Sequence, residues 1–143
     1  MLGRFLNMKI EPYNFVSALN CVLAQRLVRR ICSHCKRRVK ASPELLVESG
    51  LDAGTYGEMW FFEGAGCLEC GGTGYAGRTA ICELLDVSDQ VRELILARKS
   101  SADIKRAARE EGMVFLRESA VTKALAGHTT LHEINKVTFV EVA

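Results

Sequence analysis

Four of the six cysteines form two C-x-x-C pairs, Cys32 with Cys35 and Cys67 with Cys70. Each pair lets one tight turn present two thiolates, and four thiolates in a tetrahedron are the preferred ligands of a structural zinc ion. With Zn–S bonds of about 2.3 Å, neighbouring sulfurs should lie about 3.7 Å apart. Four protein ligands leave no position for water, so one structural zinc is predicted, with no catalytic or cofactor-binding residue.

The remaining cysteines and the histidines carry weaker signals. Cys21 and Cys82 stand alone, and a single cysteine is usually a small buried apolar residue, so both are expected in the core. His128 and His132 are four residues apart, but no third ligand lies near them in the sequence. A hydrated surface is the better interpretation for these two side chains.

The stretch around the second pair, GCLECGGTGYAGRT (residues 66–79), also matches two other motifs. It contains G-x-x-x-x-G-R-T, yet a phosphate-binding loop follows a strand, opens a helix and carries a Lys. Here a cysteine pair comes first, a strand is predicted next, and Arg78 replaces the Lys. The match to the zinc repeat of the Hsp40 chaperones fails because KRRV, without glycines, follows Cys35. The glycines are instead predicted to allow tight turns beside the metal.

Positive charge is concentrated near the start of the chain. Residues 1–40 hold nine Lys and Arg against one acid, a balance of +8, and residues 41–143 hold ten against sixteen, a balance of −6. Residues 26–40, RLVRRICSHCKRRVK, contain seven basic residues and no acid, and a basic strand is expected there. This block fits either a solvated face or an anionic partner. The candidate partner contacts are Arg26, Arg29, Arg30, Arg37 and Arg38.

Two other functions fit part of the pattern. A zinc-ribbon nucleic-acid-binding module would use the basic block and the cysteine pairs, and it predicts salt-sensitive binding. The 31 residues between the pairs, the acidic second half and the lack of aromatic residues within the basic block argue against it. A thiol oxidoreductase would need a cysteine of low pKa at a helix start in a βαβ unit, and that context is missing.

Composition and pattern predict an α+β fold for the 143 residues, of which 48% are apolar. No signal peptide or membrane-spanning run is recognised, so the cytoplasm is the expected compartment. A helix is predicted after Ser42 and strands over residues 59–64 and 78–87. Further helices are predicted over residues 89–99, 102–111, 114–126 and 131–139. Their expected N-caps include Ser88, Ser101 and a capping box of Thr130 with Glu133.

The order of these pieces resembles the C-terminal part of the type II secretion and type IV pilus assembly ATPases (the GspE/PulE and PilB family). The tetracysteine pair followed by GTGY-x-GR-x-x-x-x-E, residues 72–83, is specific to these assembly ATPases. Further matches are MLGRFLNMKIEP, SALNCVLAQRLVRRICSHCK and KRAAREEGMVFLRESAVTKALAGHTTLHEINKVT, so nearly the whole chain is covered. The stretch ALNCVLAQRLVRRIC favours the secretion branch.

The resemblance implies how the chain is organised. Residues 1–31 would be the end of the nucleotide-binding domain, a helix to about Leu19 and then a strand, a choice that periodicity alone leaves open. Residues 32–72 would be a zinc lobe inserted into a strand pair, residues 73–87 the returning strand, and residues 88–143 a C-terminal helical subdomain. The family's role in zinc binding carries over to Cys32, Cys35, Cys67 and Cys70.

The resemblance also implies partners, but no activity for this chain alone. The family's phosphate-binding loop and Walker B acid lie upstream of the matched region, so ATP and magnesium are expected only in the full-length protein. Expected partners are neighbouring subunits of a hexameric motor and inner-membrane platform proteins, and no nucleic acid. The expected location is the cytoplasm, peripheral to the inner membrane. The predicted function is a non-catalytic, structural zinc module that helps couple ATP hydrolysis to secretion or pilus assembly.

Overall fold

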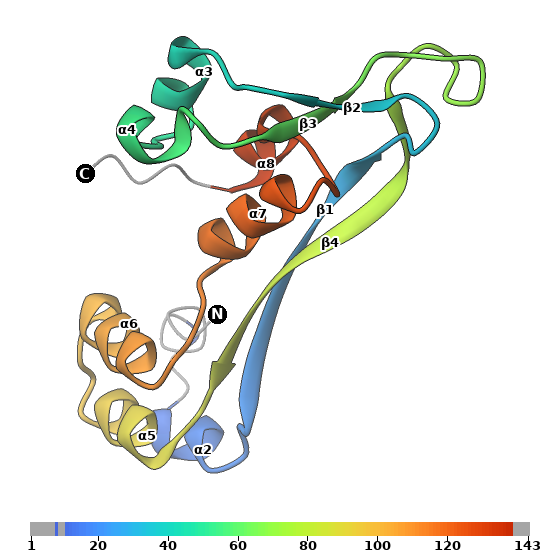
Figure 1. The fold of residues 1–143 in the computed structure, drawn as a ribbon. Coiled ribbons are helices and arrows are strands. Elements are labelled where there is room, and N and C mark those ends of the chain that lie inside the picture. The colour runs from blue at the N-terminus through green and yellow to red at the C-terminus, as the bar shows by residue number, and fades with distance from the viewer. Residues whose placement is uncertain (1–7, 9–10, 139–143) are drawn as a thin grey trace. The chain divides into compact units, whose positions relative to one another are not determined.

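A computed structural model describes residue 8 and residues 11–138, apart from the side chains of Pro12 and Tyr13. The chain forms two compact units, one from the described part of residues 1–24 with residues 83–114, the other from residues 25–82 with the described part of 115–143. Strands and helices are mixed in sequence, which confirms the predicted α+β class (Figure 1).

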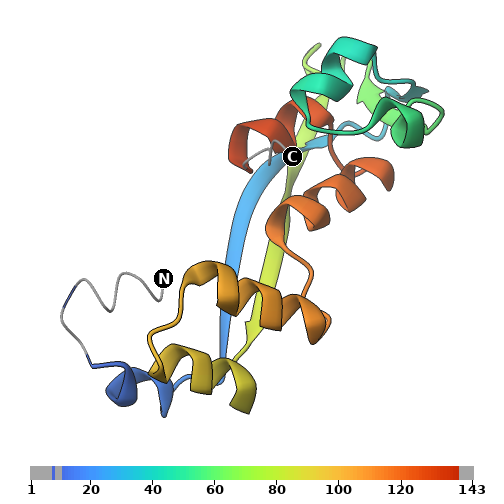
Figure 2. The same ribbon diagram turned by 90° about the vertical axis from the view of Figure 1, so that its left-hand side faces the viewer.

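The described part of the first unit contains the short helices α2 (Pro12–Val16), α5 (Asp89–Leu96) and α6 (Ser101–Glu110). The views in Figures 1 and 2 both show these helices as neighbours. Apolar residues from α2 and α5 meet in a small core made by Phe15, Val16, Val87, Val91 and Ile95. Burial of these side chains holds short helices together that would not be stable alone in water.

The second unit contains α3 (Pro43–Glu48), α4 (Ala53–Tyr56), α7 (Leu116–Leu125) and α8 (Leu131–Val137). It also contains the strands β2 (Lys36–Val39) and β3 (Phe61–Gly64). Its core is built around residues of several elements, Val28, Leu46, Phe61, Ile81, Ala120, Ala124 and Ile134. A single apolar cluster therefore ties the segment between the cysteine pairs to the C-terminal helices.

Within residues 11–138 the strands form two separate two-stranded sheets. The long strands β1 (Cys21–Ile31) and β4 (Tyr75–Asp86) pair with each other, and β2 pairs with β3. The β2–β3 pair is antiparallel, with Arg38 opposite Phe62 and Val39 opposite Phe61. The segment that carries the cysteines thus lies between the two strands of one pair, as predicted. The basic block is not one strand, however, because the turn at residues 33–35 divides it between β1 and β2.

Most predicted helix starts are confirmed, and one is wrong. The Ser42, Ser88 and Thr130 side chains each accept a hydrogen bond from an N–H in the first turn of α3, α5 and α8. The cap of α6 is Ser100 rather than Ser101, and its hydroxyl accepts from the Asp103 N–H. Two adjacent serines offer equivalent caps, and the sequence pattern alone did not separate them. The expected end of the last helix at residue 139 and most of residues 1–12 lie outside the described residues.

Only the Thr130 half of the capping box forms, because the Glu133 carboxylate binds Arg29 and Lys136 instead of a backbone N–H at the start of its own helix. This buried carboxylate accepts from the Arg29 backbone N–H and from the guanidinium Nε and Nη2, all within 2.9 Å. Lys136 donates to the same carboxylate at 3.2 Å, and the Arg29 guanidinium lies 4.1 Å from the Tyr75 ring centroid. These contacts join β1, β4 and α8, whereas a capping box would have tied Glu133 to its own helix.

The Glu133 network predicts a pH-dependent stability. Burial opposes ionisation of Glu133, but the hydrogen bonds from Arg29 and Lys136 outweigh it and lower the pKa of the carboxyl. Because the folded pKa lies below the unfolded value of about 4.3, the stabilisation is complete above that pH. It is lost as the pH falls through the folded pKa. We expect Glu133→Gln to lower the free energy of unfolding by about 2 kcal/mol at pH 7, with the difference shrinking in acid.

Urea titrations of both proteins between pH 7 and pH 3 measure this difference. The matched control is Glu44→Gln, an exposed acid in the first turn of α3. A difference between the wild type and Glu133→Gln that stays constant over this pH range would contradict the ionic role of Glu133.

Candidate metal centre

The four predicted cysteines converge in the second unit. Their sulfurs all lie within 4.8 Å of one another. Sγ of Cys32 lies 3.8 Å from Sγ of Cys67, Sγ of Cys35 lies 3.9 Å from Sγ of Cys70, and the Sγ atoms of Cys67 and Cys70 are 3.7 Å apart. These separations match the edge of a tetrahedron of zinc–thiolate bonds, about 3.7 Å, and they are far longer than the S–S bond of a disulfide.

Backbone N–H groups surround the sulfurs. The N–H groups of Cys67 and Gly74 donate to Sγ of Cys70 at 3.3 and 3.2 Å, and the N–H of Gly66 donates to Sγ of Cys35 at 3.3 Å. Such donors spread the negative charge of bound thiolates and hold each sulfur in one orientation. The turns at the two pairs therefore supply both the ligands and the groups that stabilise them.

The thiols differ in acidity. Burial opposes ionisation of Cys70, but the N–H donors from Cys67 and Gly74 and the neighbouring thiols lower the pKa of Cys70 to about 6. Burial raises the pKa of Cys35 to about 11, and the Gly66 N–H only partly offsets this. Cys70 therefore ionises readily, whereas the pKa values of Cys35 and Cys67 are raised, as expected when neighbouring thiols share one small volume. Ionised thiols so close together would repel one another. A divalent cation bound between them would offset this repulsion and favour ionisation of all four thiols.

Two glycines allow the chain to close around the cluster. Gly64 at the end of β3 and Gly74 before β4 pass so closely that a Cβ on Gly74 would lie 2.5 Å from the Gly64 carbonyl oxygen. A Cβ on Gly64 would meet the Gly74 carbonyl oxygen in the same way. The Gly74 carbonyl also accepts from the Cys32 N–H at 2.9 Å. The close approach thus connects the two cysteine turns through the backbone.

The donor set fits zinc. Four sulfurs at tetrahedral separations suit a structural zinc ion, and Cys32 is 1% exposed while the other three are half-buried. Within residues 11–138 this is the one group of three or more Cys, His, Asp or Glu side chains placed to share an ion. His128 and His132 do not join it.

Cys21 and Cys82 are exposed, so their predicted burial is wrong. They lie on the paired strands β1 and β4, where neighbouring side chains leave them uncovered.

The five candidate partner-binding arginines have different environments. Arg29 is held by Glu133, and Arg37 pairs with Glu63 across β2 and β3 at 2.7 Å. Arg26 is exposed and donates to the neighbouring Gln25 carbonyl. The guanidinium of Arg38 lies 5.0 Å from the Trp60 ring centroid. Arg30 is also exposed. Two of the five are therefore engaged in intramolecular ion pairs, which leaves Arg26, Arg30 and Arg38 to face solvent.

The tertiary structure places aromatic rings beside the basic block, which the sequence pattern did not indicate. Lys40 lies 5.3 Å from the centroid of Trp60, and Lys36 lies 5.1 Å from that of Phe62. Both rings come from the segment around β3, twenty or more residues along the chain from their partners. Trp60 and Phe62 are alternate residues of MWFFEG, so they lie on the same face of the strand. Their position beside the cations of KRRVK follows only once the pairing of β2 and β3 is known.

Among the described residues, none of the helices is both long and apolar enough to cross a membrane. The longest, α6 and α7, have ten residues each.

Comparisons with known proteins find relatives over nearly the whole chain. The profile of the family described as Type II/IV secretion system protein matches residues 1–136. The type IV pilus assembly ATPase PilB of Thermus thermophilus is 50% identical over 93% of this chain and 15% of its own length. PilB of Pseudomonas aeruginosa is 36% identical over 96% of this chain and 24% of its own length. Type II secretion system protein E of Klebsiella pneumoniae is 37% identical over 96% of this chain and 27% of its own length.

Both the pilus and the secretion branch are represented among these relatives. The chain spans between 15% and 27% of the length of these three proteins. The profile match covers well over half of the chain, and the resemblance seen in the sequence extends over the same residues. The chain therefore belongs to the Type II/IV secretion system protein family.

Proposed function

We propose that this chain is the structural zinc module of a secretion or pilus assembly motor. The observation that carries the proposal is the cluster of Cys32, Cys35, Cys67 and Cys70, whose sulfurs lie at zinc–thiolate spacing and accept backbone N–H groups. A closed set of four thiolates holds zinc without an open position, so the ion stabilises the lobe and performs no chemistry. Short strands and helices with a shared core gain much of their stability from such an ion.

In this proposal the chain has no catalytic role of its own. The two pilus assembly relatives are named as ATPases, and the chain spans only 15% of the length of the Thermus thermophilus protein. The one glycine-rich stretch with a phosphate-loop spacing has Arg78 in place of the Lys and leads into β4 rather than into a helix. ATP and magnesium would therefore bind to other parts of the full-length protein.

The module would serve as a contact point in a larger assembly. Residues 32–72 would be the zinc lobe, inserted between the last strand of the nucleotide-binding domain and its returning partner, and residues 88–143 the helical subdomain. Its partners would be neighbouring subunits of a hexamer and platform proteins at the cytoplasmic side of the inner membrane. Through these contacts the motions driven by ATP hydrolysis would be coupled to secretion or pilus assembly.

Native mass spectrometry of the purified chain, beside a denatured sample, tests the metal part of this proposal. We expect one zinc ion per chain, with four protons fewer than the thiol form when zinc is bound to four thiolates. Colorimetric release by a chelator gives an independent zinc count. A chain that carries no zinc after purification in zinc-containing buffer, or that carries two disulfides, would refute the module. An ATP hydrolysis assay of the same sample should give no turnover.

A further inference from the structure

Tyr75 stands where the turn of the second cysteine pair leads into β4. Its neighbour Gly74 donates its N–H to Sγ of Cys70 at 3.2 Å, and the Gly74 carbonyl accepts from the Cys32 N–H at 2.9 Å. The residue before Tyr75 therefore contacts one cysteine of each pair. A metal ion that holds Cys32 and Cys70 also holds the backbone from which the Tyr75 side chain extends.

The side chain of Tyr75 reaches the start of α8. Its hydroxyl shares a hydrogen bond of 2.9 Å with the hydroxyl of Thr130, the N-cap residue that accepts from the Glu133 N–H at 3.2 Å. The Tyr75 ring lies 4.1 Å from the Arg29 guanidinium, which is bound to the Glu133 carboxylate. Tyr75 thus contacts the helix cap through its hydroxyl and the Arg29–Glu133 ion pair through its ring.

β1 connects the first cysteine pair to the same turn. This strand ends at Ile31, directly before that pair, and the Ile31 N–H donates to the His128 carbonyl at 3.1 Å. The Arg29 carbonyl accepts from the Thr129 hydroxyl at 2.8 Å. Three consecutive residues that lead into α8, residues 128–130, are therefore held by the two chain segments that flank the cysteine cluster.

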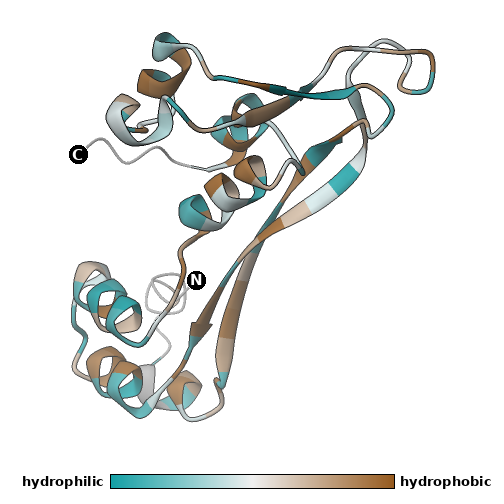
Figure 3. Ribbon diagram, viewed as in Figure 1, coloured by the Kyte–Doolittle hydropathy of each residue, from teal (hydrophilic) through white to brown (hydrophobic). Residues whose placement is uncertain are grey.

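Apolar burial holds a different part of β4. The core cluster of the second unit takes Ile81 from this strand, farther along than Tyr75. Figure 3 shows pale and hydrophilic colours on β4 nearer its start and hydrophobic colours farther along. Around Tyr75 the strand is therefore positioned by hydrogen bonds and by the cysteine turn rather than by the core.

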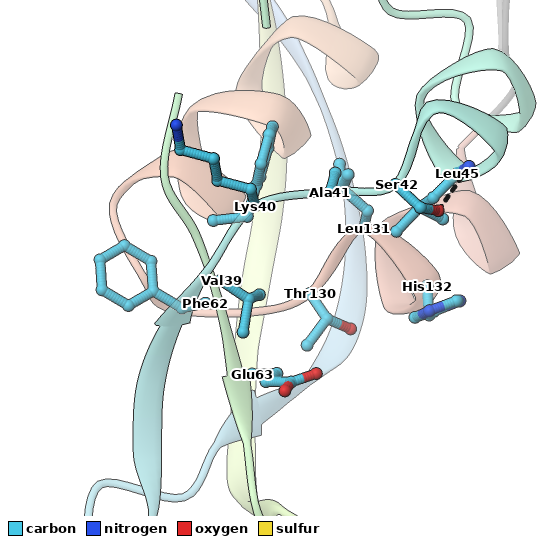
Figure 4. Close-up of a pocket in the computed structure, with 11 residues that line it drawn as sticks. Val39, Lys40, Ala41, Ser42, Leu45, Phe62, Glu63, Thr130, Leu131 and His132 are labelled. Atoms are coloured by element: carbon cyan, nitrogen blue, oxygen red, sulfur yellow. Dashed lines mark hydrogen bonds between the residues drawn. The ribbon is translucent and has the colours of Figure 1, made fainter. Parts of the chain in front are cut away.

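The other side of the α8 start faces the β2–β3 pair. Thr130 and Leu131 line a groove together with Val39 of β2 (Figure 4). Leu131 also shares the buried core with Phe61 of β3, and β2 begins directly after Cys35. Both structures that touch the start of α8, the β2–β3 pair and the Tyr75 side chain, thus extend from the cysteine turns.

We propose that Tyr75 couples metal occupancy of the cysteine cluster to the start of α8. With the four cysteines bound to one ion, Gly74 is fixed and the Tyr75 hydroxyl is held where it binds the Thr130 hydroxyl. Without the ion, the cysteine turns shift and the cap of α8 loosens. Such coupling is reciprocal, so the contacts at α8 also raise the affinity of the cysteines for the ion. The inference rests on the proposed function, since it names the part of the module that responds to the metal.

The zinc affinities of the full chain and of Tyr75→Phe, measured by competition with a chelator, test the coupling. This substitution keeps the ring beside Arg29 and removes only the hydroxyl. We expect the affinity to fall about fivefold, although the hydroxyl is not a zinc ligand, because coupling between two sites is commonly of this size or larger. Thr130→Val removes the other hydroxyl and should lower the affinity at least as much. Thr130→Ser keeps a hydroxyl and should retain the wild-type affinity.

A double variant separates coupling from a general loss of stability. Once Thr130→Val has removed the partner, addition of Tyr75→Phe should lower the zinc affinity no further. The stability control is Ala124→Gly on the buried side of α7, away from the Tyr75 hydrogen bond. It should lower the melting temperature yet leave the zinc affinity within about twofold of the wild type. Additive losses in the double variant, or an equal loss of affinity in Ala124→Gly, would overturn the proposal.

Hydrogen exchange at α8 gives a second readout that does not depend on the affinity. The Glu133 and Ile134 amides donate to the Thr130 side chain and carbonyl, so their exchange reports on the cap. Removal of zinc from the wild type should speed their exchange at least about fivefold. In zinc-loaded Tyr75→Phe these amides should already exchange faster than in the zinc-loaded wild type. Exchange that is unchanged when zinc is removed would contradict the coupling.

Zinc is counted by native mass spectrometry in every sample, so that the failures of the two proposals can be told apart. A chain that takes up no zinc refutes the metal module and the coupling with it. A zinc-loaded chain whose Tyr75→Phe variant keeps the wild-type affinity and exchange retains the metal module and overturns the coupling alone.

Discussion

Replacement of Cys70 by Ser should abolish stable zinc binding and unfold the segment between β1 and β4. The serine hydroxyl does not ionise near neutral pH and is a poor zinc ligand, so the site would lose one of its four bonds. The N–H groups of Cys67 and Gly74, which now donate to Sγ of Cys70, would lose a charged acceptor. We expect the zinc affinity to fall by more than about a hundredfold, since even changes outside the ligand set cost 10–100-fold.

Competition with a chelator of known zinc affinity measures this loss, and hydrogen exchange at the amides of β2 and β3 locates the unfolding. The control is Cys82→Ser, because Cys82 is an exposed thiol outside the cluster. Cys82→Ser should keep wild-type affinity and protection. A Cys70→Ser chain that holds zinc as tightly as the wild type would show that the four thiols do not act together as a metal site.

Replacement of Gly74 by Ala should destabilise the lobe far more than replacement of Gly72. Both glycines have positive φ, +81° and +82°, so both alanines carry a similar backbone cost of about 1 kcal/mol. Around Gly72 there is open space, whereas a Cβ on Gly74 would lie 2.5 Å from the Gly64 carbonyl oxygen. That contact involves backbone on both sides and cannot be relieved by a rotamer change. We expect an additional loss of about 3 kcal/mol for Gly74→Ala.

Thermal unfolding of the two variants with zinc present, together with the zinc content of each, measures the difference. Because the Gly74 carbonyl accepts from the Cys32 N–H, displacement of Gly74 should also weaken zinc binding. The comparison between the two alanines removes the shared cost of positive φ and isolates the close approach. Equal melting temperatures for Gly72→Ala and Gly74→Ala would mean that the two glycine backbones are not packed against each other.

The cysteine cluster and the helix caps were predictable from the sequence alone. The spacing of Cys32 with Cys35 and of Cys67 with Cys70 predicted one four-sulfur cluster, because a tight turn determines where two thiols of a pair point. Ser42, Ser88 and Thr130 were recognisable as helix caps, since a hydroxyl that accepts an N–H two or three residues on depends only on neighbouring backbone. Such interactions act over a few residues, and the sequence by itself determined them.

Contacts between distant segments were decided only by the tertiary structure. Glu133 has the spacing of a capping box, but the arrival of β1 offers it a guanidinium and a backbone N–H of Arg29, a stronger set of donors than its own helix provides. The basic block lacks aromatic residues in sequence, yet the pairing of β2 with β3 sets Trp60 and Phe62 against its cations. Cys21 and Cys82 look like core residues until strand pairing leaves them at the surface. In each case the outcome depends on which remote chain segment packs alongside, and no local spacing encodes that choice.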